Sequence, residues 1–197
     1  MSADLVKAFF EEDLYDITKI ESEGNVKFSS SKNFSAIGEK LNFSIMDNLI
    51  NIYGNNSLIE MNNLTMKSDK YIMIDDINSK FKLEGSTSEL TTDNLKIIGS
   101  NINGSYEKVN GENEIVNLFV KSNKLTEITT DKLKMYSSEA IFSKEKNIIE
   151  LFNNVKVVRN NEVIIGDYAK INTLDESYKV SSNESKKVKV LIDSNNE

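Results

Sequence analysis

The amino-acid sequence predicts an all-β protein in which antiparallel hairpins fold into a roll or a sandwich. Apolar and polar residues alternate along most of the chain, which is typical of strands with one buried face. One strand pair also occurs twice: residues 24–28 lead to residues 37–47, and residues 154–157 lead to residues 165–175. The second strands of the two pairs align without a gap. Asparagine-rich turns separate the alternating runs, as expected for hairpins.

Length and composition limit the kind of protein. A chain of 197 residues, 39% of them hydrophobic, is large enough for one domain with its own core. The net charge of −7 and the single arginine, Arg159, argue against nucleic acid as a partner, because phosphate binding requires clustered basic residues. The chain has no cysteine and no histidine, which excludes thiol chemistry, conventional triads and histidine-based metal sites. We therefore expect no catalytic residues, no metal, no cofactor and no enzymatic activity.

Targeting signals are absent from the sequence. No run of about 18 apolar residues occurs, so no transmembrane helix is predicted. The first residues, Met1 to Asp4, lack the basic and apolar segments of a signal peptide. Taken alone, these features predict a soluble cytoplasmic protein, but a chain whose export signal had been removed would look the same.

The first predicted element is a short helix at residues 4–16, within an N-terminal arm of residues 1–19. Apolar residues at helical spacing precede a run of acidic residues. This helix would serve either as a lid on one end of the core or as an interaction arm. Its apolar residues are Leu5, Val6, Phe9 and Phe10.

Residues 20–192 form the predicted β-domain, and residues 193–197 form a predicted disordered tail. Within the domain, the polar segment 106–114 predicts a longer loop. Tight turns are predicted where asparagine, aspartate or glycine interrupts the alternation, because these residues tolerate positive φ angles or turn geometry. The predicted turns are residues 47–48, 54–56, 62–63, 103–104, 160–161 and 175–176.

An acidic residue recurs at the start of five segments, after a small residue and before apolar residues two and four positions later. The uneven separation of about 24 to 38 residues favours hairpins over the constant coils of a parallel β-helix. Paired carboxylates can hydrolyse glycosides, but a carboxylate that accepts backbone N–H groups at a chain corner is the simpler interpretation. The five residues are Glu39, Asp69, Asp93, Asp131 and Asp167.

One apolar face of the predicted strands is the candidate functional site. It forms either an ordinary sandwich core or a trough between slightly separated sheets. A trough suits acyl chains, because each buried CH₂ group contributes about 0.8 kcal/mol. The predicted lipid-binding residues, assigned by alternation, are Val26, Phe28, Leu41, Phe43, Ile45, Leu95, Ile97, Leu133, Met135, Leu151, Val155, Val157, Ile165 and Ile171.

The strand edges at the two ends of the domain offer a second functional feature. Proline, which often protects an edge strand, is absent from the chain. A first edge at residues 20–28 and a last edge at residues 187–192 are predicted to pair between copies. Such a head-to-tail contact extends into filaments. The alternative is that the protein's own helix covers the edge.

The repeated strand pair resembles a known family. Residues 148–157, followed by residues 165–171, are similar to the OstA/LptA-type repeat, in which apolar-x-G-N-V-x-V precedes a short hairpin and G-D-x-apolar-x-apolar. Residues 23–41 match the pattern again, and residues 185–192 are similar to the end of such domains. Asn153 replaces a glycine of the pattern. The middle copies replace another glycine by Thr92 and Thr130, and they look more like segments of the related LptC proteins.

The resemblance implies an antiparallel β-jellyroll of stacked V-shaped hairpins that acts in the periplasm. This family takes lipopolysaccharide from an inner-membrane transporter and passes it toward the outer membrane through a chain of such domains. The implied partners are lipopolysaccharide, other Lpt proteins joined by edge-strand pairing, and copies of the chain itself in a head-to-tail oligomer. An export signal or membrane anchor is then expected to be missing from this chain.

Three alternatives to an LptA-like carrier stay open on the sequence. One is an LptC-like periplasmic domain of the transporter complex. The second is a structural β-solenoid or adhesin-type scaffold. The third is a carboxylate-dependent hydrolase, which requires two of the repeated acidic residues to lie about 5 to 10 Å apart.

Overall fold

The computed structural model describes residues 1–11, 16–30, 33–183 and 187–192, and its regular elements are all β-strands. The strands are β1 (Leu5–Phe10), β2 (Ile17–Ser30), β3 (Phe34–Ser44), β4 (Leu49–Tyr53), β5 (Ser57–Met61), β6 (Leu64–Ser68), β7 (Tyr71–Asp75), β8 (Lys80–Thr91), β9 (Lys96–Val109), β10 (Glu112–Thr129), β11 (Lys134–Ser143), β12 (Ile148–Arg159), β13 (Glu162–Asn172), β14 (Tyr178–Ser181) and β15 (Lys189–Ile192). In these described ranges, no helix is long and apolar enough to cross a membrane.

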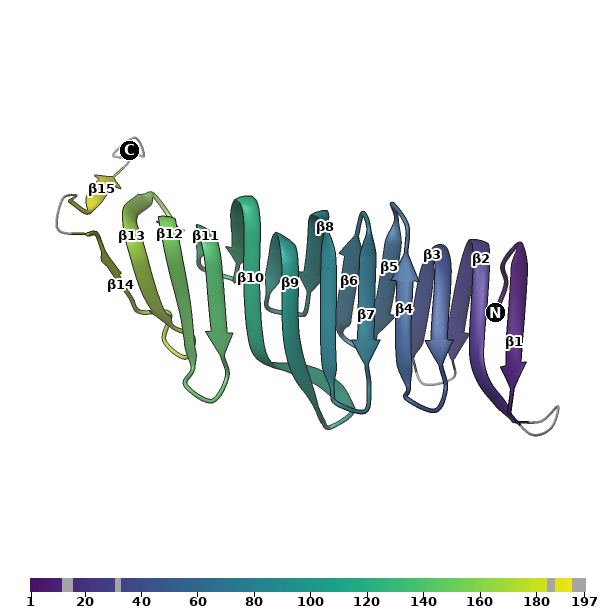
Figure 1. Cartoon of the computed structure of the whole chain (residues 1–197). Coiled ribbons are helices and arrows are strands. Elements are labelled where there is room, and N and C mark those ends of the chain that lie inside the picture. Colours follow the sequence, from purple (N-terminus) through teal and green to yellow (C-terminus); the bar gives the residue numbers. More distant parts are fainter. Residues whose placement is uncertain (12–15, 31–32, 184–186, 193–197) are drawn as a thin grey trace.

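The strands form one 15-stranded sheet in nearly sequential order, β1-β2-β3-β4-β7-β8-β9-β10-β11-β12-β13-β14. Figure 1 shows them side by side, from β1 at one end of the molecule to β14 and β15 at the other. Every pairing between the described strands is antiparallel. The predicted all-β fold of antiparallel hairpins is confirmed, and the parallel coils of a β-helix are not its architecture.

The sheet folds over on itself because its long strands bend in the middle. The first part of β3, residues 34–37, pairs with β5, whereas residues 40–44 pair with β4. In β8, residues 80–84 pair with β7 and residues 88–91 pair with β6. Each long strand therefore contributes one half to each of two facing layers. We call the layer with β5 and β6 layer A and the layer with β4 and β7 layer B.

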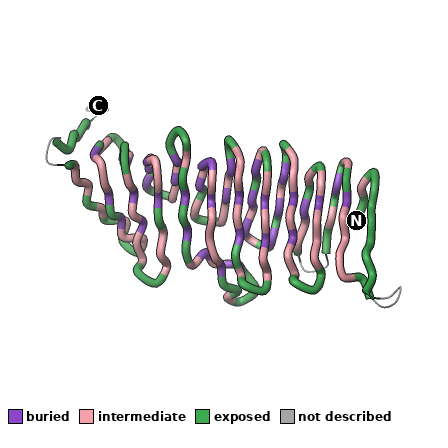
Figure 2. The backbone as a smooth tube through the Cα atoms, in the orientation of Figure 1, coloured by how far each residue is buried: buried purple, intermediate pink, exposed green. Residues whose placement is uncertain are grey.

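The hydrophobic core lies between the two layers. In β4, Ile50 and Ile52 are buried while the alternate residues are partly exposed, as expected for a strand with one covered face. The same alternation recurs from strand to strand along the molecule (Figure 2). Phe81, Leu83 and Ile102 at the middle of the sheet are 2%, 0% and 0% exposed. One core thus runs from β2 to β13, whereas the residues of β1 and β15 are exposed.

The predicted N-terminal helix is wrong. Residues 5–10 form β1, which pairs with β2 from Leu5 opposite Glu23 to Phe10 opposite Ile17. A helix this short is marginal in water, whereas the edge of β2 offers unpaired backbone N–H and C=O groups. Part of the predicted helix, residues 12–15, and the predicted tail, residues 193–197, lie outside the described residues.

Most predicted turns are confirmed, and the asparagines adopt the expected backbone. Asn48, Asn62 and Asn160 have φ angles of 46°, 52° and 50°. The predicted turn at residues 103–104 is wrong, because it lies inside β9. Gly104 is required there for a different reason: a Cβ atom would lie 2.5 Å from Cζ of Phe81.

The predicted loop at residues 106–114 is also wrong. These residues continue β9 and β10 as a paired hairpin that turns at Asn110 and Gly111, with φ angles of 54° and 87°. Their polar composition reflects exposure to solvent on one side of the hairpin rather than the lack of strand structure.

Candidate lipid-binding site

Most of the predicted lipid-binding residues lie in the interior between the layers. Their side chains are 0–2% exposed, so the protein's own side chains fill this space, for which the sequence allowed either an ordinary core or an open trough. Interiors of this kind are close-packed, and an incoming acyl chain must move side chains or separate the layers. These interior residues are Val26, Leu41, Ile97, Leu133, Met135, Leu151, Val155, Val157 and Ile171.

Phe28, Phe43 and Leu95 lie at the rim of the interior, where they are partly buried against the core. The Phe28 ring centroid is 5.9 Å from that of Phe34 in layer A and 5.8 Å from that of Phe43 in layer B. The rings therefore bridge the two layers. We call this rim the mouth; it is bordered by the turns at residues 45–48, 76–79 and 144–147 of layer B and 62–63, 92–95 and 130–133 of layer A.

Ile45 and Ile165 do not face the interior, and their assignment to the lipid-binding face is wrong. Ile45 lies in the turn after β3 and is 38% exposed. Ile165 is 36% exposed because β13 bends beyond it: Gly166 is buried, and the next inward residue is Ala169. The partner strand β12 has a register shift at the same level, between Phe152 and Val155. Such a shift reverses the facing that simple alternation predicts.

The central strands supply much of the interior, and their residues were missing from the sequence-based list. They obey the same alternation, for example in the runs 49–53 and 71–75, so the signal was present. The additional interior residues include Ile50, Ile52, Ile59, Leu64, Met66, Ile72, Ile74, Phe81, Leu83, Leu90, Ile102, Leu118 and Val120.

Acidic residues at the bends accept hydrogen bonds from the neighbouring chain. Glu39 Oε1 accepts from the backbone N of Asn55 at 3.2 Å, and Asp167 Oδ2 accepts from the backbone N of Asn183 at 3.1 Å. Gly54, with a φ of 126°, lies against Glu39, since a Cβ atom there would be 2.6 Å from Cγ of that residue. These carboxylates hold corners of the fold.

Asp69 has the same role in the next bend. Its carboxylate accepts hydrogen bonds from Ser86 Oγ and from the backbone N of Thr87. The hydrogen bond from Ser86 lowers the pKa of Asp69, and burial opposes this shift. Asp93 and Asp131, by contrast, lie in exposed hairpin turns at the mouth rather than at bends. Among the described residues, no group of three or more acidic side chains is arranged to hold a metal ion.

Polar contacts cross the mouth near the C-terminal end. Glu176, in the turn before β14, accepts a hydrogen bond from Thr130 Oγ1 at 3.0 Å and lies 3.4 Å from Nζ of Lys132.

A hollow of about 420 Å³ also opens at the mouth, and its apolar lining residues are Leu95, Ile115 and Phe142. Residues of both layers line this hollow, and Leu95 and Phe142 also pack against the core.

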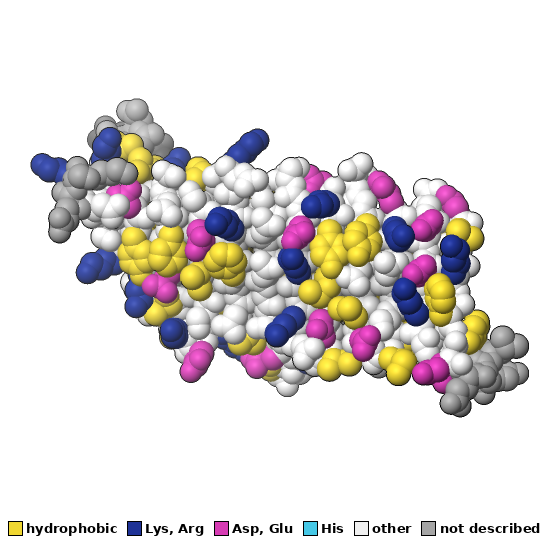
Figure 3. Space-filling view, viewed as in Figure 1, with side chains coloured by type: hydrophobic (Ala, Val, Ile, Leu, Met, Phe, Trp, Pro, Cys, Tyr) yellow, Lys and Arg dark blue, Asp and Glu magenta, His cyan; other side chains and the backbone are white. Residues whose placement is uncertain are grey.

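The outer face of the sheet differs from the interior. Figure 3 shows its hydrophobic side chains as separate groups among lysine and acidic residues. Two aromatic pairs lie outside the core, Tyr53 with Tyr71 at 5.0 Å and Phe152 with Tyr168 at 5.4 Å between ring centroids. Small, separated groups are ordinary on a soluble surface. The apolar interior is therefore the better candidate for binding a lipid.

The fold and its interior define a class: an elongated antiparallel jellyroll with one apolar core between its two layers. No protein-family model matches the chain, and no curated protein matches its sequence. The structure is similar to the crystal structure of LptH from Pseudomonas aeruginosa, described as the LptA-homologous periplasmic component of the lipopolysaccharide transport device. The TM-score is 0.55 with 12% sequence identity, over 67% of this chain and 96% of LptH. At this identity the similarity establishes an LptA-like fold.

Proposed function

We propose that this protein is a non-enzymatic periplasmic carrier that binds the acyl chains of lipopolysaccharide between its two layers. It passes the lipid from the inner-membrane transporter toward the outer membrane. The observation that carries this proposal is the apolar interior that runs from β2 to β13 and ends in partly buried side chains at the mouth. The LptA-like fold supports it.

The energetics suit a lipid with a large anionic headgroup. The protein carries a net charge of −7, which repels an anionic headgroup, so the headgroup stays in solvent. The acyl chains would provide the binding energy, at about 0.8 kcal/mol for each CH₂ group removed from water. Transfer along successive domains then requires no cofactor, only interiors that continue from one domain to the next.

The test compares two substitutions near the same end of the mouth. Phe43→Glu places a charge at the rim of the interior, whereas Ile45→Glu places the same charge in an exposed turn two residues away. We expect Phe43→Glu to weaken binding of lipopolysaccharide at least about tenfold, equivalent to about 1.4 kcal/mol, and Ile45→Glu to bind like the parent. Native mass spectrometry with lipopolysaccharide, and with phospholipid as a control lipid, measures the binding of the two variants and the parent.

Circular dichroism and thermal unfolding must show that both variants fold. Ile171→Glu is a poorer probe, because Ile171 is 1% exposed and a buried carboxylate there would disrupt folding. If folded Phe43→Glu binds lipopolysaccharide as well as Ile45→Glu and the parent, the interior is not the lipid site.

The ends of the sheet support a further part of the proposal, an assembly through edge strands. The predicted first edge at residues 20–28 is wrong, because β1 covers β2 and Ser2 bridges to Lys27. The exposed edge is β1 itself, with Leu5 and Val6 46% and 48% exposed. At the other end, β14 and β15 each pair with β13. We propose that β1 of one domain pairs with this far end of a copy or of another Lpt-like domain.

Charges on the last strand are expected to block this assembly. In the double variant Val190→Lys/Leu191→Lys, the side chains that are 55% and 57% exposed become charged. Leu174→Lys is the control, since Leu174 is 76% exposed but lies in a turn. Sedimentation velocity over a tenfold concentration range should show ladders of protomers for the parent and the control and monomers for the double variant. A parent that stays monomeric would instead favour an LptC-like domain.

A further inference from the structure

One hairpin is longer than its neighbours and leaves the plane of its layer. Next to it, layer B turns back at residues 76–79 and 144–147, whereas β9 and β10 continue to a turn at Asn110 and Gly111. Their pairing shifts register between Ile115 and Asn117, where the hairpin departs from layer B. Figure 1 shows these paired ends sweeping diagonally along the lower edge of the molecule. We call residues 106–115 the strap.

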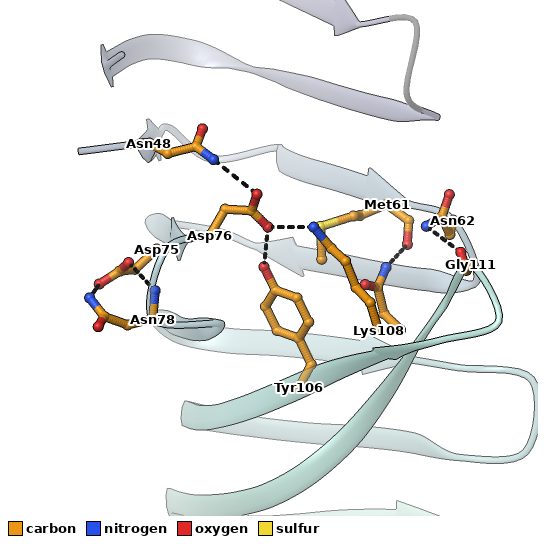
Figure 4. Close-up of polar contacts among 10 residues, drawn as sticks. Asn48, Met61, Asn62, Asp75, Asp76, Asn78, Tyr106, Lys108 and Gly111 are labelled. Atoms are coloured by element: carbon orange, nitrogen blue, oxygen red, sulfur yellow. Dashed lines mark hydrogen bonds and ion pairs between the residues drawn. The ribbon is translucent and has the colours of Figure 1, made fainter. Parts of the chain in front are cut away.

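The tip of the strap contacts the opposite layer. Asn62, in the turn between β5 and β6, donates from Nδ2 to the carbonyl oxygen of Gly111 at 2.9 Å. Asn113 donates from Nδ2 to the carbonyl oxygen of Met61, and its backbone N donates to Asn63 Oδ1, both at 2.9 Å. Figure 4 shows the contacts of Asn62 and Met61. Since β5 and β6 belong to layer A, the strap crosses the mouth.

Ionic and polar contacts hold the base of the strap to layer B on one side. Asp76, in the turn after β7, accepts hydrogen bonds from Tyr106 OH at 2.8 Å and from Lys108 Nζ at 2.9 Å. Asn48 Nδ2, from the preceding turn of the same layer, donates to the other carboxylate oxygen at 2.9 Å (Figure 4).

On the other side of the strap, Lys144 holds both of its strands. This residue lies in the turn after β11 and forms ion pairs with Glu107 and, at 2.5 Å, with Glu114. Hydrogen bonds to charged groups are stronger than neutral ones where water is partly excluded, as at Asp76, whose side chain is 30% exposed, whereas the more exposed Lys144 pairs contribute less. The base is therefore held by charged groups, whereas the tip is held by neutral amide contacts.

The inner side of the strap covers the apolar interior. Tyr106 and Ile115 are 3% and 8% exposed, and the Tyr106 ring stacks on Phe81 at 6.5 Å between centroids. Ile115 also lines the hollow at the mouth. At the tip, Asn113 Oδ1 is buried without a hydrogen-bond partner in the described part of the chain. A buried unpaired acceptor weakens the closed contact.

We propose that the strap is a gate, whose tip must leave the β5–β6 turn before an acyl chain can enter the interior. This inference rests on the proposed function as a lipid carrier. With the tip in place, Tyr106 and Ile115 cover Phe81 and the interior residues are almost inaccessible, so an incoming acyl chain has to displace the strap to reach the middle strands. The neutral tip detaches first, and the strap pivots on the base that Asp76 and Lys144 hold.

A disulfide across the mouth tests the gate. The side chain of Asn63 reaches the backbone of Asn113, and the natural chain has no cysteine, so Asn63→Cys/Asn113→Cys introduces a single bridge. The control is Asn101→Cys/Lys121→Cys, which joins two residues paired between β9 and β10 within layer B. The probe is fluorescently labelled lipopolysaccharide, and mass spectrometry verifies each bridge.

We expect the oxidised mouth bridge to slow association with lipopolysaccharide at least tenfold relative to the reduced pair. The reduced pair should associate at least as fast as the parent, because both substitutions also remove hydrogen bonds at the tip. The control pair should bind equally when oxidised and when reduced. Equal binding by the oxidised and reduced mouth pair overturns the gate while the carrier function stands. If neither the parent nor the control binds lipopolysaccharide, the carrier function fails and the gate fails with it.

A second variant tests the gate without a new bridge. Asn62→Ala removes the hydrogen bond to Gly111 at an exposed turn, where a folding defect is not expected. We expect lipopolysaccharide to associate with this variant faster than with the parent. A rate equal to that of the parent, or slower, argues that release of the tip does not control entry.

Discussion

Replacing Phe81 by alanine is expected to lower the free energy of unfolding by about 3–5 kcal/mol. The ring is 2% exposed, stacks on Tyr106 and occupies the space that Gly104 leaves open. Because glycine has no side chain to move into the cavity, the lost contacts cannot be recovered by local repacking. Phe81 lies in the part of β8 that pairs with β7 in layer B, so the loss also removes packing between this layer and Tyr106 of the strap.

The matched control is Phe119→Ala, which removes the same side chain from the outer face of layer B. Phe119 is 38% exposed, so we expect a change below about 1 kcal/mol. Urea unfolding followed by circular dichroism gives both values from the midpoint and slope. Equal losses for the two variants would show that the interior is not the main source of stability.

The second large effect is expected at Asp76. Asp76→Ala removes the acceptor of hydrogen bonds from Tyr106, Lys108 and Asn48, and we expect it to lower the free energy of unfolding at pH 7 by about 1–3 kcal/mol. Tyr106 is only 3% exposed, so its hydroxyl group has little access to replacement water. Asp93→Ala, in an exposed turn, is the control and should unfold like the parent.

The pH dependence of this difference tests the physical cause. Burial by itself raises the pKa of Asp76, but the hydrogen bonds from Lys108 and Tyr106 and the charge of Lys108 outweigh burial, so the pKa is lowered. A carboxyl group with a lower pKa in the folded state stabilises the protein above its unfolded-state pKa, about 3.9. That contribution is lost as the pH falls through the folded-state pKa.

The stability difference between the parent and Asp76→Ala should therefore be constant from about pH 7 to pH 5 and shrink below about pH 4. Unfolding in urea at each pH measures it. A difference that keeps its full size well below pH 4 would show that the carboxylate charge is not the source of stability, and that Ala merely leaves a packing defect.

Local pattern was sufficient for the strands and for most inward-facing residues. The alternation that places Leu41 and Val155 inside reflects a period of two, which neighbouring residues alone establish. The turns at Asn48 and Asn160 likewise depend on the tolerance of asparagine for positive φ. Strand alternation and asparagine turns depend only on neighbouring residues, so the sequence was sufficient to predict them.

Alternation assigned the wrong side-chain direction where a partner strand changes the pairing. Ile165 points outward because β13 bends opposite the register shift of β12, and a shift of this kind leaves no mark in the local alternation. The segment Leu5 to Phe10 has helical spacing, yet it became a strand because a free edge of β2 was available. In both cases a neighbouring strand overrode the local preference of the segment.

The amino-acid sequence alone thus accounts for the class of fold, its antiparallel hairpins and one continuous apolar face. Folding in three dimensions added that this face is filled by the protein's own side chains, and that residues 106–115 cross from layer B to layer A. Asn113 meets Met61 and Asn63 across the mouth although about fifty positions separate them in the chain. Periodicity describes residues a few positions apart, whereas these contacts exist only because bent strands bring two layers face to face.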